Sequence, residues 1–151
     1  MCVRQQSPAQ QSIRRPNVST TKHSRISKGE VDRFIVEKIE SVPHMEALLL
    51  IWETRPQQWS ESDLAERLFV RPEAARRIMR DLVTQGLVSA SKEGSQKYSY
   101  PSASPARDDL MKSVAETYRS ELVRVSGMIH SKASGALREF ARAFEFGRKK
   151  E

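Results

Sequence analysis

The sequence contains a single cysteine, Cys2, among its 151 residues, so the chain can form no internal disulfide. No Cys or His spacing typical of a zinc site is present. The first residues lack the apolar core of a signal peptide, and no apolar run approaches the ~20 residues that a membrane span requires. We therefore expect a cytoplasmic protein without membrane contact.

The sequence also lacks groups of residues typical of an active site. His23, His44 and His130 are scattered along the chain and have no neighbours typical of a metal ligand set or a catalytic triad. Gly94 is a lone turn glycine rather than part of a phosphate-binding loop. The sequence predicts no enzyme activity, no catalytic residue, no metal and no cofactor.

Acidic residues are absent from residues 1–27, which carry five of the basic side chains behind the net charge of +7. Residues 28–66 have four basic and nine acidic groups, residues 67–97 have seven and three, and residues 98–151 have ten and seven. The positive charge outside the N-terminus is therefore concentrated rather than interspersed, which is typical of a surface that faces a polyanion.

Three segments follow from composition. Residues 1–27 are rich in Gln, Ser, Thr, Arg and Pro and have few large aliphatic side chains, which predicts a disordered basic arm. This arm is either a solvated leader without a role or a segment that binds phosphates nonspecifically. We expect a folded domain over 28–105 and a C-terminal helical extension over 106–151.

The folded domain begins with two expected helices. Apolar residues at helical spacing, Val31, Phe34, Ile35 and Ile39, predict a helix near 29–40. A second helix opens at Ser41-Val42-Pro43 and ends near Thr54, and its continuous apolar run predicts the most buried position.

Two further helices have clear boundaries. Ser60 with Asp63 forms an N-terminal cap for a helix over 61–68, and Trp59 is placed to pack against Leu64. Pro72 and Gly86 bound a helix over 72–85. Its apolar stripe consists of Ala75, Ile78, Met79 and Leu82, and its opposite face of Glu73, Arg76, Arg77, Arg80 and Thr84.

A hairpin follows, with strands over Leu87–Ser91 and Gln96–Tyr100. The order of helix, helix, glycine stop and hairpin predicts a mainly α fold: a winged helix-turn-helix domain with a small β-hairpin wing and C-terminal amphipathic helices. Lys92 and Lys97 make the wing basic.

Residues 106–130 predict one long amphipathic helix, and a shorter helix follows a break at Ser134-Gly135. The apolar row of the long helix is extensive: Leu110, Val114, Tyr118, Leu122, Val125 and Ile129. This row either folds back on the helix at 29–40 or pairs with its copy in a homodimer. We favour the homodimer, with Leu137, Phe140 and Phe144 closing the interface.

Three parts of the sequence together resemble the winged-helix transcription factors of bacteria. They are the Leu64-Ala65 start, the stripe residues Ala75, Ile78 and Leu82, and Gly86-Leu87-Val88. The multiple-antibiotic-resistance regulator (MarR) type is among the most similar, and the resemblance covers roughly residues 44–101. It implies that Arg76, Arg77 and Arg80 lie on a helix inserted in the major groove. It also implies that Lys92 and Lys97 lie on a wing near the minor groove.

The function expected from these features is a transcriptional regulator that binds double-stranded DNA, because guanidinium groups on one exposed face can pair with guanine or bind phosphate. The candidate DNA-binding residues are Arg76, Arg77, Arg80, Thr84, Lys92 and Lys97. Two alternatives remain open. The arginines can form a solvated face paired with Glu73 and Asp81, or the domain can be an interaction module for an acidic protein partner.

Overall fold

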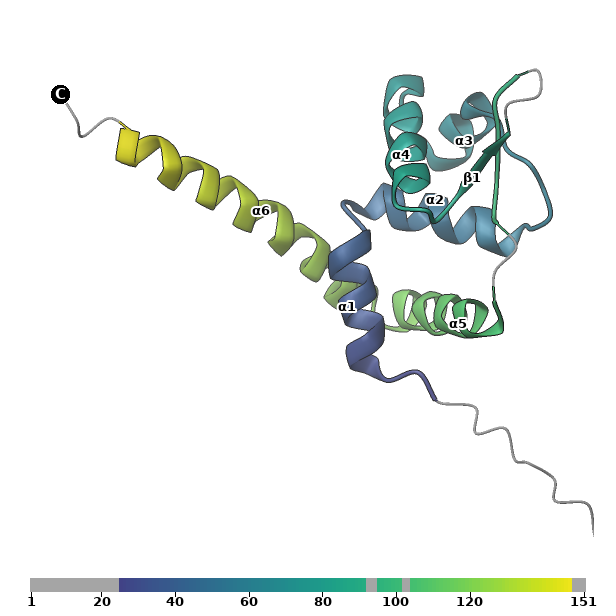
Figure 1. Cartoon of the computed structure of the whole chain (residues 1–151), viewed down its shortest axis with the longest axis horizontal. Coiled ribbons are helices and arrows are strands. Elements are labelled where there is room, and N and C mark those ends of the chain that lie inside the picture. The colour runs from purple at the N-terminus through teal and green to yellow at the C-terminus, as the bar shows by residue number, and fades with distance from the viewer. Residues whose placement is uncertain (1–24, 92–94, 102–103, 148–151) are drawn as a thin grey trace, which may run out of the picture.

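The structure is a computed structural model that describes residues 25–91, 95–101 and 104–147, with side chains described to residue 135. Within these ranges the chain forms six helices and one two-stranded antiparallel hairpin (Figure 1). No helix in the described ranges is long and apolar enough to cross a membrane. The mainly α winged-helix architecture expected from the sequence is confirmed.

The first two helices have the expected positions. Helix α1 spans Lys28–Lys38 and is capped by a reciprocal pair of hydrogen bonds between Ser27 and Glu30. Helix α2 spans Val42–Glu53 and is the most apolar helix of the fold. Ile26 packs against the core and Ser27 caps α1, so these two residues belong to the folded domain rather than to the expected arm.

Helices α3 (Glu61–Leu68) and α4 (Pro72–Thr84) form the helix-turn-helix. The Ser60–Asp63 capping box predicted from the sequence starts α3, and Pro72 lies at the first position of α4. Gly86 adopts φ +67°, the left-handed conformation that ends a helix and that glycine tolerates best.

Strands β1 (Ser89–Ser91) and β2 (Lys97–Ser99) form the wing and are shorter than the sequence suggested. Their register places Ala90 opposite Tyr98. Trp59, the residue before the cap of α3, forms a bridge with Tyr98 through two backbone hydrogen bonds of 2.8 Å. This bridge joins the wing directly to the helix-turn-helix, and Trp59 and Tyr98 are both buried in the core.

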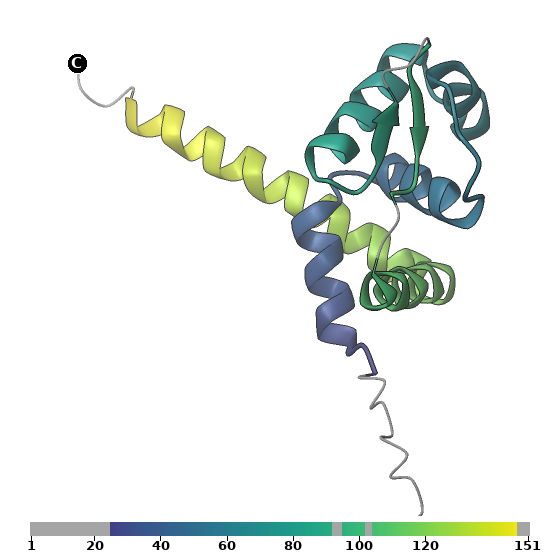
Figure 2. The ribbon, with the colours of Figure 1, turned by 45° about the vertical axis from the view of Figure 1, so that its right-hand side comes forward.

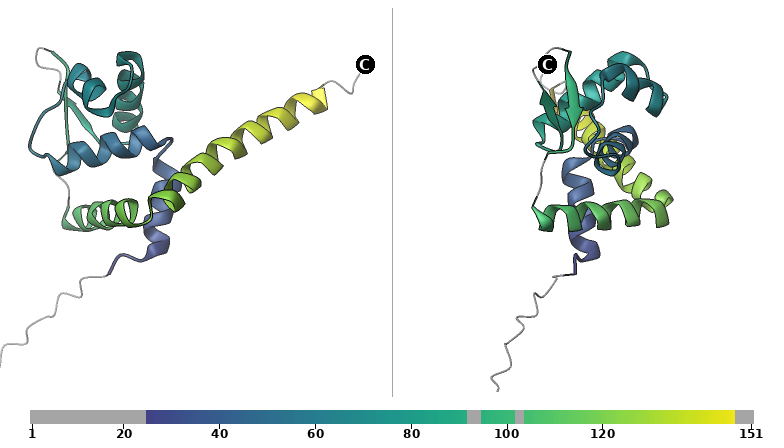
Figure 3. Two further views of the ribbon diagram at one scale, coloured as in Figure 1. Left: turned by 180° about the vertical axis from the view of Figure 1, so that it is seen from behind. Right: turned by 90° about the vertical axis from the view of Figure 1, so that its right-hand side faces the viewer.

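Helix α2 lies between two layers, with α3, α4 and the hairpin on one side and α5 (Pro105–Ser120) on the other (Figures 1 and 3). Met45, Leu48 and Ile51 are fully buried along it. The arrangement explains the continuous apolar run of its sequence, because a helix covered on opposite sides has no exposed stripe to keep polar.

The expected long helix over 106–130 is wrong. The chain breaks at Glu121, which has φ −128° and ψ 38°, and a new helix, α6, runs over Leu122–Gly147. The break predicted at Ser134-Gly135 is absent, because α6 continues through both residues. Beyond its first turns α6 extends away from the rest of the molecule (Figure 2).

Helix α1 packs against both α5 and α6 and covers the apolar row that the sequence predicted for residues 110–129. Val114, Val125 and Ile129 are no more than 1% exposed within the single chain, and Tyr118 is also buried. The row therefore folds back on its own domain, and the expectation that it forms a homodimer interface is wrong for these residues. Leu122 is the exception, at 49% exposed.

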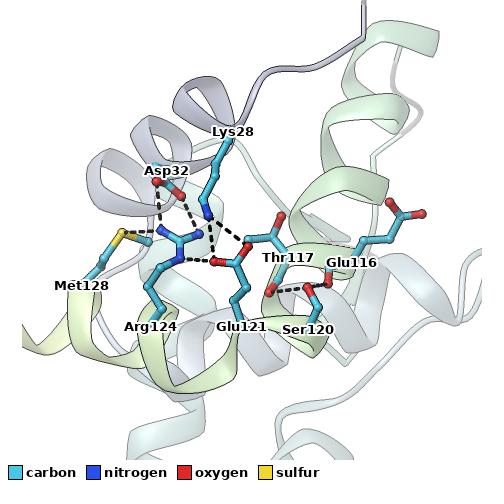
Figure 4. A network of polar contacts seen from close by, with 8 residues as sticks. All are labelled: Lys28, Asp32, Glu116, Thr117, Ser120, Glu121, Arg124 and Met128. Carbon is cyan, nitrogen blue, oxygen red and sulfur yellow. Dashed lines mark hydrogen bonds and ion pairs between the residues drawn. The ribbon is translucent and has the colours of Figure 1, made fainter.

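A polar network fastens α1 to the break between α5 and α6 (Figure 4). Arg124 donates to both oxygens of Asp32, over 2.9 and 3.0 Å, and also to Glu121. Lys28 Nζ reaches Glu121 over 3.0 Å. Hydrogen bonds from Lys28 and Arg124 hold the pKa of Glu121 below its usual range. The residue at the helix break is thus also the one that ties the two helices to α1.

Candidate nucleic-acid interface

The exposed side of α4 faces away from α2 and the core. Ala75, Ile78, Met79 and Leu82 are buried along one side of the helix, with an amphipathic pattern as the sequence predicts. Arg77, Arg80 and Thr84 lie exposed on the other side, and we call this set the basic face. The Thr84 hydroxyl donates to the carbonyl oxygen of Arg80 over 2.8 Å, so it is oriented along the helix.

Two carboxylates near the basic face have partners elsewhere. Asp81 Oδ2 lies 3.1 Å from His44 Nε2 of α2, and Asp63 contacts its own cap residue Ser60. Among the residues that the structure describes, Arg77 and Arg80 form no ion pair. The expected alternative, in which the arginines pair with Glu73 and Asp81, is not what the structure shows.

Arg76 differs from its neighbours because it lies on the flank of α4 that faces α3. Its Nε donates to Glu61 Oε2 over 3.0 Å, and Tyr98 of the wing donates its hydroxyl to Glu61 Oε1 over 3.0 Å. The Arg76 hydrogen bond lowers the pKa of Glu61 below its usual range. Burial, together with the bond to Glu61, raises the pKa of Tyr98 to about 12. Glu61 thus joins α3, α4 and the wing.

A hollow of about 440 Å³ opens between α4 and the wing. It brings together three of the predicted residues, Arg76, Arg80 and Thr84, with Gln96 and Tyr98 of the hairpin. Gln96 was not singled out from the sequence, although it lies two residues from Tyr98 and so on the same side of an extended strand. Its exposed amide provides both donors and acceptors beside the basic face.

The remaining predicted wing residues are not brought to this hollow. Lys97 alternates with Tyr98 on β2 and is absent from the lining, although its charge helps to lower the pKa of Asp63. Lys92 lies outside the described residues. Arg77 is on the basic face but does not line the hollow.

Two arginines that the sequence reasoning did not use extend the positive surface. Arg71 is exposed at the N-cap position of α4, and Arg67 is exposed in the last turn of α3. Neither forms an ion pair within the described part of the chain. A search for exposed basic residues at the ends of both helices would have found them.

His44 is not the isolated histidine that the sequence suggested. It is 7% exposed, with Nδ1 2.7 Å from Ser41 Oγ and Nε2 3.1 Å from Asp81 Oδ2. It therefore links the first turn of α2 to the middle of α4, through a residue that directly follows Arg80.

These elements define a winged helix-turn-helix with a basic second helix. Solved structures with a similar course of the chain include a MarR family transcriptional regulator from Streptomyces coelicolor. It is 18% identical, with 79% of this chain and 82% of that chain covered and a TM-score of 0.49. The adhesin competence repressor of Streptococcus pyogenes is 12% identical, over 80% and 91% of the two chains, with a TM-score of 0.44. No family model and no curated protein matches the sequence.

Proposed function

We propose that the chain is a transcriptional regulator that binds double-stranded DNA through α4, with the wing beside it. The observation that carries the proposal is the clustering of unpaired arginines on one exposed surface. Arg77 and Arg80 lie on the same face of α4 without a carboxylate partner among the described residues, and the unpaired Arg67 and Arg71 lie at the adjoining ends of α3 and α4, whereas Arg76 donates to Glu61.

Unpaired guanidinium groups on an exposed helix are suited to phosphate oxygens and to the O6 and N7 atoms of guanine. An Arg that already donates to a carboxylate would have to give up that bond on binding DNA, which reduces the gain. We therefore assign the major contacts to Arg77 and Arg80, supported by Thr84. Arg76 is primarily a positioning residue that holds α4 against α3 and the wing, and Lys92 and Lys97 supply positive charge on the hairpin.

The test is fluorescence anisotropy with DNA from upstream of the protein's own gene and with random duplex DNA. The double variant R77E/R80E should lose binding to both, and each phosphate contact removed should lower the salt slope by about 0.9. R76Q should weaken binding less than R80Q does. Equal losses for R76Q and R80Q would show that Arg76 leaves Glu61 to contact DNA.

A matched control separates local contacts from net charge. The double variant R33E/K112E makes the same change in charge at two exposed residues of α1 and α5, outside the helix-turn-helix and the wing. It should retain most of the affinity. A folded R77E/R80E protein with unchanged DNA binding would overturn the proposal and favour an acidic protein partner for the same face.

The proposed regulator is a homodimer that binds a site with twofold symmetry. The support lies in α6, which extends beyond the residues packed on α1 and α5 (Figure 1). In the sequence its distal part carries Leu137, Phe140, Ala141 and Phe144 at helical spacing. A second copy of α6 is the proposed partner of this part of the helix.

A further inference from the structure

Three potential metal ligands meet where α1, α2 and α4 come together. Glu40 lies between α1 and α2, His44 is in the first turn of α2, and Asp81 is in α4. One ligand atom from each residue lies within 4.8 Å of the other two. We propose that these residues form a binding site for a divalent transition-metal ion, with Zn²⁺ the best fit.

The pair at the centre of the site has nearly the right spacing for such an ion. His44 Nε2 and Asp81 Oδ2 are 3.1 Å apart. Two ligands of a tetrahedral Zn²⁺ with bonds of 2.0–2.1 Å are about 3.3 Å apart, so an ion that replaces the shared proton requires little movement here. Glu40 must approach more closely, and its exposed side chain has no contact in the described structure that prevents this.

The contact on the other side of the imidazole ring also favours His44 as a metal ligand. Its other ring nitrogen, Nδ1, lies 2.7 Å from Ser41 Oγ. Ser41 is the N-cap residue of α2, yet its side chain makes no capping bond to the backbone. Without an ion, Nε2–H donates to the Asp81 carboxylate; when an ion takes the place of that proton, Nδ1–H can donate to Ser41 Oγ and the lone pair of Nε2 is left for the ion. A partner outside the ligand shell commonly orients a ligating imidazole in this way.

The donor set also fits the chemistry of the ion. Two carboxylates and a neutral imidazole balance the charge of a divalent cation, and three protein ligands leave the fourth position of Zn²⁺ to water. The nearby amine of Lys38 is 3.4 Å from the amide oxygen of Gln85, which lies just after α4. The ion would strengthen the existing connection between α4 and the junction of α1 with α2.

Sequence spacing did not reveal this site because its ligands are not adjacent in the chain. Asp81 is 37 residues from His44. Only the packing of α4 on α2 brings the two side chains together.

The test is calorimetric titration of the full chain with Zn²⁺ in the absence of DNA, so that its result is independent of the proposed function. All proteins should carry C2S and H23A, which remove two N-terminal metal ligands outside the described residues. E40Q and D81N should each bind at least tenfold more weakly than this background. The matched control E37Q changes an exposed carboxylate one turn earlier on α1 and should bind equally well.

Two further measurements make the outcome decisive. Co²⁺ should give the visible absorption of a four-coordinate site, and S41A should bind about 10–100-fold more weakly because it removes the partner that orients His44. Circular dichroism confirms that each variant is folded, and E40Q is the safest variant because Glu40 is exposed. Absence of Zn²⁺ binding in the background protein, or equal affinity in E40Q and E37Q, would overturn the proposal.

Discussion

The tyrosines show how burial of single residues changes ionisation. Burial raises the pKa of Tyr98 and of Tyr118 to about 12 and raises that of Tyr100 above its ordinary value. The acceptors for Tyr98 and Tyr118 are Glu61 and Glu46, whose negative charges oppose a phenolate. Tyr98 and Tyr118 are therefore neutral well above pH 10 in the folded protein.

This arrangement predicts loss of stability in strong alkali. A tyrosine whose pKa is higher in the folded than in the unfolded state stabilises the fold to its full extent below pH ~10. This contribution is lost as the pH rises toward ~12. We expect urea unfolding to show a falling free energy of unfolding between these values. Phenolate absorbance of Tyr98 and Tyr118 should rise near pH 12 in the native protein and near pH 10 in urea, and a native protein in which either of these two tyrosines titrated near 10 would contradict the assignment.

An ion pair between Arg124 and Asp32 connects α6 to α1 beside their apolar contact. Arg124 is 33% exposed and Asp32 is 30% exposed, and both terminal nitrogens of the guanidinium, Nη1 and Nη2, donate to the carboxylate. A pair of this exposure stabilises by only about 0.5 kcal/mol, since solvent screens it.

A double-mutant cycle with R124A and D32A should therefore give a coupling on the order of 0.5 kcal/mol in urea unfolding, and salt should reduce it. The pair Arg119–Glu53 provides the control, because its arginine is 63% exposed and it lies outside the network. Its coupling should be smaller. Equal couplings would mean that the network around Glu121 adds nothing beyond an ordinary surface pair.

At the scale of the elements, Gly86 determines where α4 ends and the wing begins. Its φ of +67° is left-handed, and a Cβ added there would meet no atom within 4 Å. The cost of a side chain is therefore conformational rather than steric crowding by neighbours.

We expect G86A to lower the free energy of unfolding by about 1 kcal/mol, and G86N to lower it less, because Asn tolerates the left-handed region better. Urea unfolding of the three proteins provides the measurement. A G86A protein as stable as the wild type would show that the end of α4 adopts another conformation.

At the scale of the whole molecule, the apolar row of α5 and the start of α6 is part of the domain core, so this row is not available for a contact between copies. Val114 is fully buried within its own chain, and V114E should unfold the protein rather than separate subunits. The sequence of distal α6 is the better place to test assembly.

Light scattering of the wild type should give about twice the chain mass of 17.2 kDa at micromolar concentration. L137E/F144E should shift the mass to that of one chain, because it places charges at two apolar sequence positions of α6. The control Q57E/Q58E adds the same number of acidic groups to an exposed loop. A wild-type mass of one chain would exclude the dimer.

The sequence by itself determined the local elements of this protein. The Ser60–Asp63 cap, Pro72, Gly86 and the apolar stripe of α4 are local signals, and the helices they predicted match the structure within a residue or two. The exposed arginines of α4 followed from the same periodicity, because a buried stripe fixes which side chains face the solvent.

Tertiary structure alone decided which charges remain free and which apolar residues are covered. Asp81 faces His44 rather than the basic face, Glu61 takes Arg76, and α1 covers the row around Val114. Each of these contacts joins residues that are distant in sequence, and local periodicity carries no information about which partner a side chain meets. The break at Glu121 belongs with them, because α5 and α6 turn there to pack on α1, where Lys28 and Asp32 hold the break in place.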